Sequence, residues 1–95
     1  MAKDLFNLKE YGIVTFKSTS QALKAERVLK EASADFLVIP TPRQISASCG
    51  LAVKVAPENL DYVRSALHDK LVQIEGVYHF TAADGESRLE KLGHD

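Results

Sequence analysis

Apolar and polar residues alternate with two different periods along this chain, and the changes of period mark the predicted elements. Residues 11–16, Y-G-I-V-T-F, have the β-branched and aromatic content of a strand, and their mostly apolar character favours a central position. Residues 36–39 are a short apolar run, and residues 51–55 alternate as a strand with one buried face does. Gly76 ends the connection that precedes a further strand at residues 77–80. The sequence therefore predicts four strands.

Two helices are predicted between these strands. Ser18 followed by Gln21 is a capping-box pattern, and good helix formers continue to Ala32. Pro57 is well placed as the first residue of a second helix, which we expect to end at about Leu71. Each helix has one apolar stripe that can pack on a sheet. The stripes contain Ala22, Ala25, Val28, Leu29 and Ala32 in the first helix, and Leu60, Val63, Leu67 and Leu71 in the second.

The order strand-helix-strand-strand-helix-strand is that of the ferredoxin-like fold. We therefore predict an α+β domain over residues 11–80, with a four-stranded antiparallel sheet and both helices on one face. Residues 1–10 are predicted to be an N-terminal arm. Residues 81–95 are polar and lack a core stripe, so we expect a flexible C-terminal tail.

Composition and charge narrow the class of protein. A hydrophobic share of 45% with 26% charged residues is ordinary for a globular domain, and a formal net charge of −1 gives no field that attracts nucleic acid. No apolar run approaches the ~20 residues of a membrane-spanning helix, and residues 1–10 lack the apolar centre of a signal peptide. We therefore expect a cytoplasmic protein that binds neither nucleic acid nor membrane. The single cysteine agrees, because it cannot form an intramolecular disulfide.

That cysteine, Cys49, is the candidate reactive residue, and it lies in the segment P-T-P-R-Q-I-S-A-S-C-G-L of residues 40–51. In the predicted topology the third strand starts beside the end of the first, which places Cys49 near Phe16 and Lys17, at the amino end of the first helix. Counting back by twos from Val55 puts its side chain on the helix-facing side of the sheet.

A helix amino end would favour the thiolate of Cys49, because its unpaired N–H groups carry a partial positive charge. The candidate stabilising residues are Arg43, Lys17, Ser18 and Thr19. Such surroundings predict a thiol pKa below the ordinary value of about 8.5. Two other interpretations stay open: the same corner could receive a small anion, or Cys49 could be a small buried apolar residue.

The rest of the segment shapes the loop around Cys49. The prolines stiffen its entry, Gly50 allows a bend or a close approach, and the serines favour turns or contacts to an anion. These candidate loop residues are Pro40, Thr41, Pro42, Ser46, Ser48 and Gly50. His68 is a weak candidate partner for the thiol, while His79 is expected far from it. The histidines have no metal-ligand spacing, so neither a metal nor another cofactor is predicted.

Two stretches, Q-A-L-K-A-E-R-V-L-K at 21–30 and V-I-P-T-P-R-Q-I-S-A-S-C-G-L-A-V-K-V at 38–55, resemble a family of small bacterial selenium/sulfur carrier protein-like proteins. The likeness covers residues 11–80, and 40–43 and 46–50 are its most specific parts. It implies that Cys49 accepts sulfur or selenium, as a persulfide or selenosulfide, from a donor protein and passes it to an acceptor. The chain would then be a carrier and not an enzyme in its own right.

A second interpretation is a non-catalytic module that pairs through its open sheet face with a copy of itself or another protein, or that senses a small anion. The side chains expected on that face are those of Phe16, Tyr78 and Phe80. A contiguous apolar patch of several hundred Å² there would need a partner.

Overall fold

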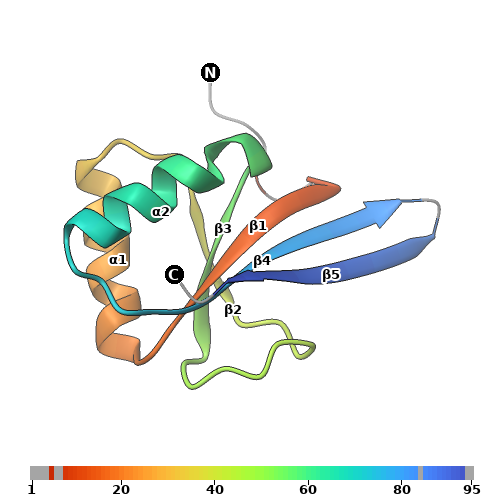
Figure 1. Ribbon diagram of the computed structural model, residues 1–95, viewed down its shortest axis with the longest axis horizontal. Coiled ribbons are helices and arrows are strands. Elements are labelled where there is room, and N and C mark those ends of the chain that lie inside the picture. Colours follow the sequence, from red (N-terminus) through yellow and green to blue (C-terminus); the bar gives the residue numbers. More distant parts are fainter. Residues whose placement is uncertain (1–4, 6–7, 84, 94–95) are drawn as a thin grey trace.

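The four predicted strands and two predicted helices all form, and a fifth strand follows them. The computed structural model describes residues 5, 8–83 and 85–93. Two helices on an antiparallel sheet make this an α+β fold (Figure 1). The elements are β1 (Glu10–Phe16), α1 (Thr19–Glu31), β2 (Leu37–Pro40), β3 (Leu51–Val55), a 3₁₀ helix η1 (Pro57–Asn59), α2 (Leu60–Asp69), β4 (Ile74–Ala83) and β5 (Glu86–Gly93).

β1 is the central strand, as its apolar character predicted. The sheet order is β2-β3-β1-β4-β5, and β1 pairs antiparallel with both β3 and β4. Val14 lies opposite Val53 on one side and Val77 on the other. The start of β3 therefore lies beside the end of β1. This is the adjacency on which the placement of Cys49 depends.

The prediction of four strands is wrong, because β4 continues beyond Phe80 and β5 pairs along it. The register runs from Ala83 opposite Glu86 to Val77 opposite Gly93. β5 is mostly exposed, so backbone pairing to the edge of β4 forms it without a large apolar contribution. The turn contains Gly85 at φ +80°, a conformation that glycine adopts without strain. The dipeptide Asp84-Gly85 is a hairpin signal in the sequence. Most of the predicted N-terminal arm lies outside the described residues.

Both faces of the sheet carry a cluster of buried side chains. The helix-side core joins α1 and α2 to the strands and includes Val14, Phe16, Val53 and Val77, so both helices cover one face, as predicted. Phe16 is fully buried in this core, and its expected place on the open face is wrong. The opposite face carries Tyr78 and Phe80 in a second, smaller cluster, which we call the aromatic face. Its members are Ile13, Ile45, Ala52 and Tyr78, with Tyr11, Ile39, Ala47, Phe80 and Leu89 packed against them.

The second helix ends earlier than predicted. α2 stops at Asp69, and Leu71 lies outside the core with 79% of its surface exposed. Val72 N–H donates to Leu67 O at 3.0 Å and Leu71 N–H donates to His68 O at 3.0 Å, the bonding pattern of a Schellman motif. Leu71 occupies the left-handed position of that motif at φ +60°, where glycine is usual. Neither helix in the described part of the chain is long and apolar enough to cross a bilayer.

Replacing Leu71 by glycine should stabilise the fold by about 0.5–1 kcal/mol. The substitution removes the steric cost of a left-handed leucine, which exceeds the extra unfolded-chain entropy of glycine. The midpoint of urea unfolding measures the change. Leu23→Gly, at another exposed leucine but inside α1, should instead cost about 1 kcal/mol. A loss of stability in Leu71→Gly would contradict this account of the helix end.

Candidate functional site

Residues 41–50 form a loop between β2 and β3 that is closed at its base. The N–H of Thr41 donates to Gly50 O, and the hydroxyl of Thr41 donates to Cys49 O, both at 2.9 Å. Ile45 N–H donates to Pro42 O at 3.0 Å, and the Ile45 side chain is buried in the aromatic face. Cys49 packs into the helix-side core instead. The loop is therefore attached to both faces at one end of the sheet.

Cys49 lies where the sequence predicted, but it is buried. Its side chain belongs to the helix-side core with Phe16, and only 3% of its surface is exposed. The Sγ atom lies 3.8 Å from Oγ1 of Thr19, the first residue of α1. The backbone N–H of Leu51 also donates to Sγ, at 3.4 Å. The amino end of α1 and the start of β3 thus provide the polar surroundings of the sulfur.

The amino end of α1 is held by half of the predicted capping box. The Ser18 hydroxyl accepts from the N–H of Gln21 at 3.3 Å. The side chain of Gln21 accepts from Gln73 N–H at 2.8 Å, a contact to the segment that leads into β4. Lys17 N–H donates to Gln73 O at 3.3 Å in the same region. The first turn of α1 contains no acidic residue, so it adds no negative charge beside the sulfur.

A carboxylate that the sequence analysis missed binds the residue before Cys49. The Oε1 atom of Glu75 accepts from Ser48 N–H at 2.8 Å, and Oε2 accepts from the Ser48 hydroxyl at 2.7 Å. These two hydrogen bonds, with the nearby charges of Lys17 and Lys91, lower the pKa of Glu75 below its ordinary value of 4.5. Glu75 therefore attaches the cysteine side of the loop to β4.

A β-bulge places Glu75 in this position. Thr15 pairs with Gly76 and Phe16 pairs with Ile74, so Glu75 is the extra residue on β4. A side chain on Gly76 would put its Cβ 2.9 Å from the ring of Tyr78, which explains the glycine there. Glycine inside a strand pattern often marks a bulge. Gly76 was the sequence signal for this feature, although the sequence analysis placed it before the strand.

The other predicted loop residues have simpler environments. Pro40 ends the edge strand β2, a position that suits a residue without a backbone N–H. Arg43 and Ser46 are exposed. Gly50 is exposed as well, and a Cβ there would meet no atom within 4 Å. The close approach that Gly50 was expected to permit is not present.

The two histidines considered as partners of the thiol, His68 and His79, have other environments. His79 Nε2 lies 3.4 Å from Glu10 Oε2, and His68 is exposed on α2. In the described part of the chain, the hydrogen-bond contacts of Cys49 Sγ are to Thr19 and Leu51 and not to either of these histidines. Among those residues, no group of three histidine, cysteine or carboxylate side chains is placed to hold a metal ion.

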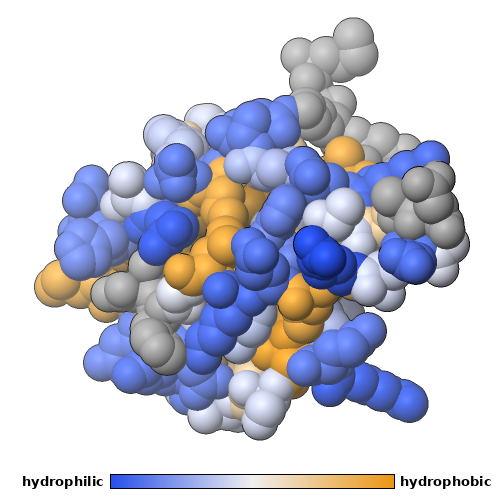
Figure 2. Space-filling view, turned by 45° about the vertical axis from the view of Figure 1, so that its right-hand side comes forward, coloured by the Kyte–Doolittle hydropathy of each residue, from blue (hydrophilic) through white to orange (hydrophobic). Residues whose placement is uncertain are grey.

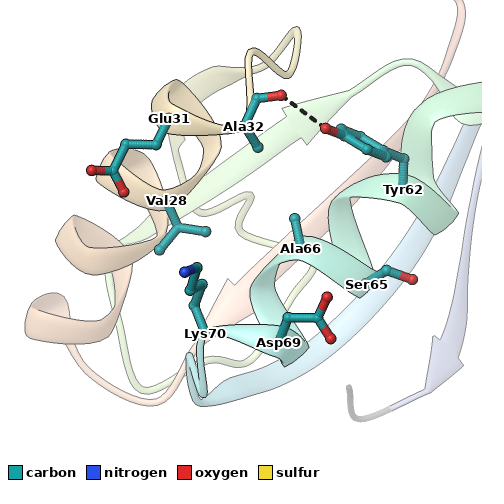
Figure 3. Close-up of a pocket in the computed structure, with 8 residues that line it drawn as sticks. All are labelled: Val28, Glu31, Ala32, Tyr62, Ser65, Ala66, Asp69 and Lys70. Carbon is teal, nitrogen blue, oxygen red and sulfur yellow. Dashed lines mark hydrogen bonds between the residues drawn. The ribbon is translucent and has the colours of Figure 1, made fainter.

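A shallow groove of about 390 Å³ lies between α1 and α2 (Figure 3). Val28 and Ala66 contribute apolar surface, and the Tyr62 hydroxyl closes one end by donating to Ala32 O at 2.8 Å. None of the predicted site residues lines it. The groove is therefore separate from the loop that holds Cys49.

Comparison with protein families gives a match over residues 11–79 to the family described as "Putative Se/S carrier protein-like". The chain belongs to this family. The match runs from β1 into β4 and includes the whole loop around Cys49, so the predicted resemblance is confirmed. No curated protein and no solved structure matches the chain. The candidate site within the matched region consists of the buried Cys49, the amino end of α1 and the Ser48–Glu75 contact.

The lowered pKa of Glu75 predicts a pH-dependent contribution to stability. A carboxylate whose pKa is lower in the folded chain stabilises the fold above its unfolded pKa and loses this effect as the pH falls through the folded value. Wild type should therefore exceed Glu75→Gln in unfolding free energy near pH 7, and the difference should shrink well below about pH 4. Urea unfolding at both pH values measures it. The same difference at both would contradict the Ser48–Glu75 contact.

Proposed function

We propose that this protein carries sulfur or selenium on Cys49, as a persulfide or selenosulfide, between a donor and an acceptor protein. The observation that carries the proposal is the family match, which spans residues 11–79 and includes Cys49. Cys49 is the only cysteine in the sequence, so any such chemistry in this chain uses that one sulfur. The protein acts as a carrier, and the enzymatic steps belong to its partners.

The surroundings of Cys49 support a role for the thiolate. The Leu51 N–H donates to Sγ at 3.4 Å, and the Thr19 hydroxyl lies 3.8 Å away at the amino end of α1. Hydrogen-bond donors at a helix amino end stabilise an adjacent anion. We assign Ser18 the role of fixing this helix end, which its hydrogen bond to Gln21 supports. The exposed cations Lys17 and Arg43 are assigned the remaining, longer-range stabilisation.

The proposed transfer needs no additional oxidant or reductant. The Cys49 thiolate attacks the terminal sulfur of a persulfide on the donor, R–S–S–H. A bond forms from Sγ to that sulfur, the donor S–S bond breaks, and the donor leaves as the thiolate R–S⁻. Cys49 then carries S–S–H, and an acceptor nucleophile takes the outer sulfur in the same way. A selenosulfide would form by attack on a terminal selenium.

The proposal also includes a fold family and a cellular location for the protein. The order β2-β3-β1-β4 and the two helices on one face support a ferredoxin-like assignment, to which β5 is an addition. We place the carrier in the cytoplasm, where a reducing environment keeps a single thiol unoxidised.

The aromatic face supports a second candidate, a non-catalytic protein-interaction module. The rings of Tyr11 and Phe80 stack there with centroids 4.8 Å apart, and both side chains stay partly exposed. On the side of the molecule shown in Figure 2, apolar surface reaches solvent as separate strips between hydrophilic side chains. Sedimentation distinguishes this candidate: a stable dimer that persists in Phe80→Ser and Tyr11→Ser would exclude the aromatic face as its interface.

The carrier function is tested by loading the protein with sulfur. Incubation with a cysteine desulfurase and cysteine should add one sulfur atom to the wild type, detected by intact-mass spectrometry and removed by dithiothreitol. Cys49→Ala has no thiol and should gain no reducible sulfur. Its fold is checked by circular dichroism, because the cysteine is buried. A folded wild type that stays unloaded would contradict the proposed function.

A further inference from the structure

The buried state of Cys49 raises a question that the proposed function does not answer. With 3% of the residue exposed, Sγ has no open approach for the persulfide of a donor protein. Attack on sulfur requires the two reacting atoms to meet directly, so the thiol of a carrier must become accessible. A local movement of the loop at residues 46–50 would expose it. The need for such an opening rests on the proposed function, because only a carrier thiol must be reached by a donor protein.

The loop is attached differently along its length: residues 41–45 follow β2 and form its β2 side, and residues 46–50 precede β3 and form its cysteine side. On the β2 side, Ile45 is buried in the aromatic face, and at the base Thr41 joins the two ends of the loop by donating to Gly50 O and Cys49 O. On the cysteine side, the attachment to β4 consists of the two hydrogen bonds from Ser48 to Glu75, and both are exposed. Water can replace exposed hydrogen bonds at little cost, whereas removing Ile45 from its cluster exposes apolar surface. The cysteine side is therefore the part that opens.

Glu75 is well placed to control this opening. The bulge makes Glu75 the extra residue on β4, and a bulge changes the direction of the side chain that it carries. Glu75 accepts from both the backbone and the side chain of Ser48, the residue next to Cys49. Both bonds have an ionised acceptor, which makes them stronger than neutral hydrogen bonds.

We propose that Ser48 and Glu75 form a latch that keeps Cys49 buried in the resting protein and whose release exposes the thiol for transfer. Closure protects the thiol from adventitious oxidants, which react with accessible thiolates. Opening exchanges the two exposed hydrogen bonds of Ser48 and takes Cys49 out of the helix-side core and away from the hydroxyl of Thr41, while Ile45 stays in the aromatic face. The sheet and both helices keep their positions throughout.

The latch is tested by the rate at which iodoacetamide alkylates Cys49 in the folded protein. Glu75→Gln removes the charge from both hydrogen bonds and should raise the rate about tenfold, because the closed state loses a charge-assisted contact. Ser48→Ala keeps the backbone bond and should raise the rate less. Glu90→Gln removes an exposed carboxylate from β5, which pairs with β4, and should leave the rate unchanged.

The dependence of the alkylation rate on urea, below the unfolding transition, separates local opening from loss of the whole fold. A faster rate in Glu75→Gln that stays nearly constant with urea supports the latch. An unchanged rate, or a faster rate that rises with urea as steeply as global unfolding, would overturn it. The readout needs no sulfur donor, so the latch can hold even if the desulfurase assay fails. Conversely, sulfur loading of wild type with unaltered alkylation in Glu75→Gln would reject the latch alone.

Discussion

The pairing of β1 with β3 on one side and β4 on the other is the constraint on which the rest of the structure depends. Ile13, Val14 and Phe16 are fully buried, and they alternate between the two faces of the sheet. A slip by one residue would exchange these faces, so burial on both sides fixes the register. The register in turn brings the end of β1, the start of β3 and the bulge of β4 to the same end of the sheet.

The candidate site is a consequence of this arrangement. Cys49 precedes β3, Thr19 follows β1 by a short turn, and Glu75 lies in the bulge of β4, so three separate parts of the chain meet around one loop. The same packing that positions the sulfur also buries it. A buried thiol suits a structural residue, whereas a carrier thiol must be reached by partners. The proposed latch reconciles the two requirements, because release of the exposed Ser48–Glu75 contact lets Cys49 leave the helix-side core while the sheet and both helices stay in place.

The sequence predicted the parts of this structure that depend on local pattern. The apolar runs gave the strand positions, the Ser18–Gln21 spacing gave the start of α1, and strand adjacency placed Cys49 at that helix end. It did not predict β5, because that strand is mostly exposed and is held by backbone pairing. Nor did it predict Glu75, since a bulge depends on the register of two strands distant in sequence. The burial of Cys49 likewise depends on how the loop packs, which no local pattern specifies.

The most direct test of the account is the dependence of Cys49 alkylation on urea in the unaltered protein, at concentrations below the unfolding transition. A loop that opens locally exposes little surface, so the rate should be slower than in the unfolded chain and nearly constant with urea. A rate that rises with urea as steeply as the global unfolding equilibrium would show that only the unfolded chain exposes the thiol. Cys49 would then be a core residue, and its role as a carrier in the folded protein would be contradicted.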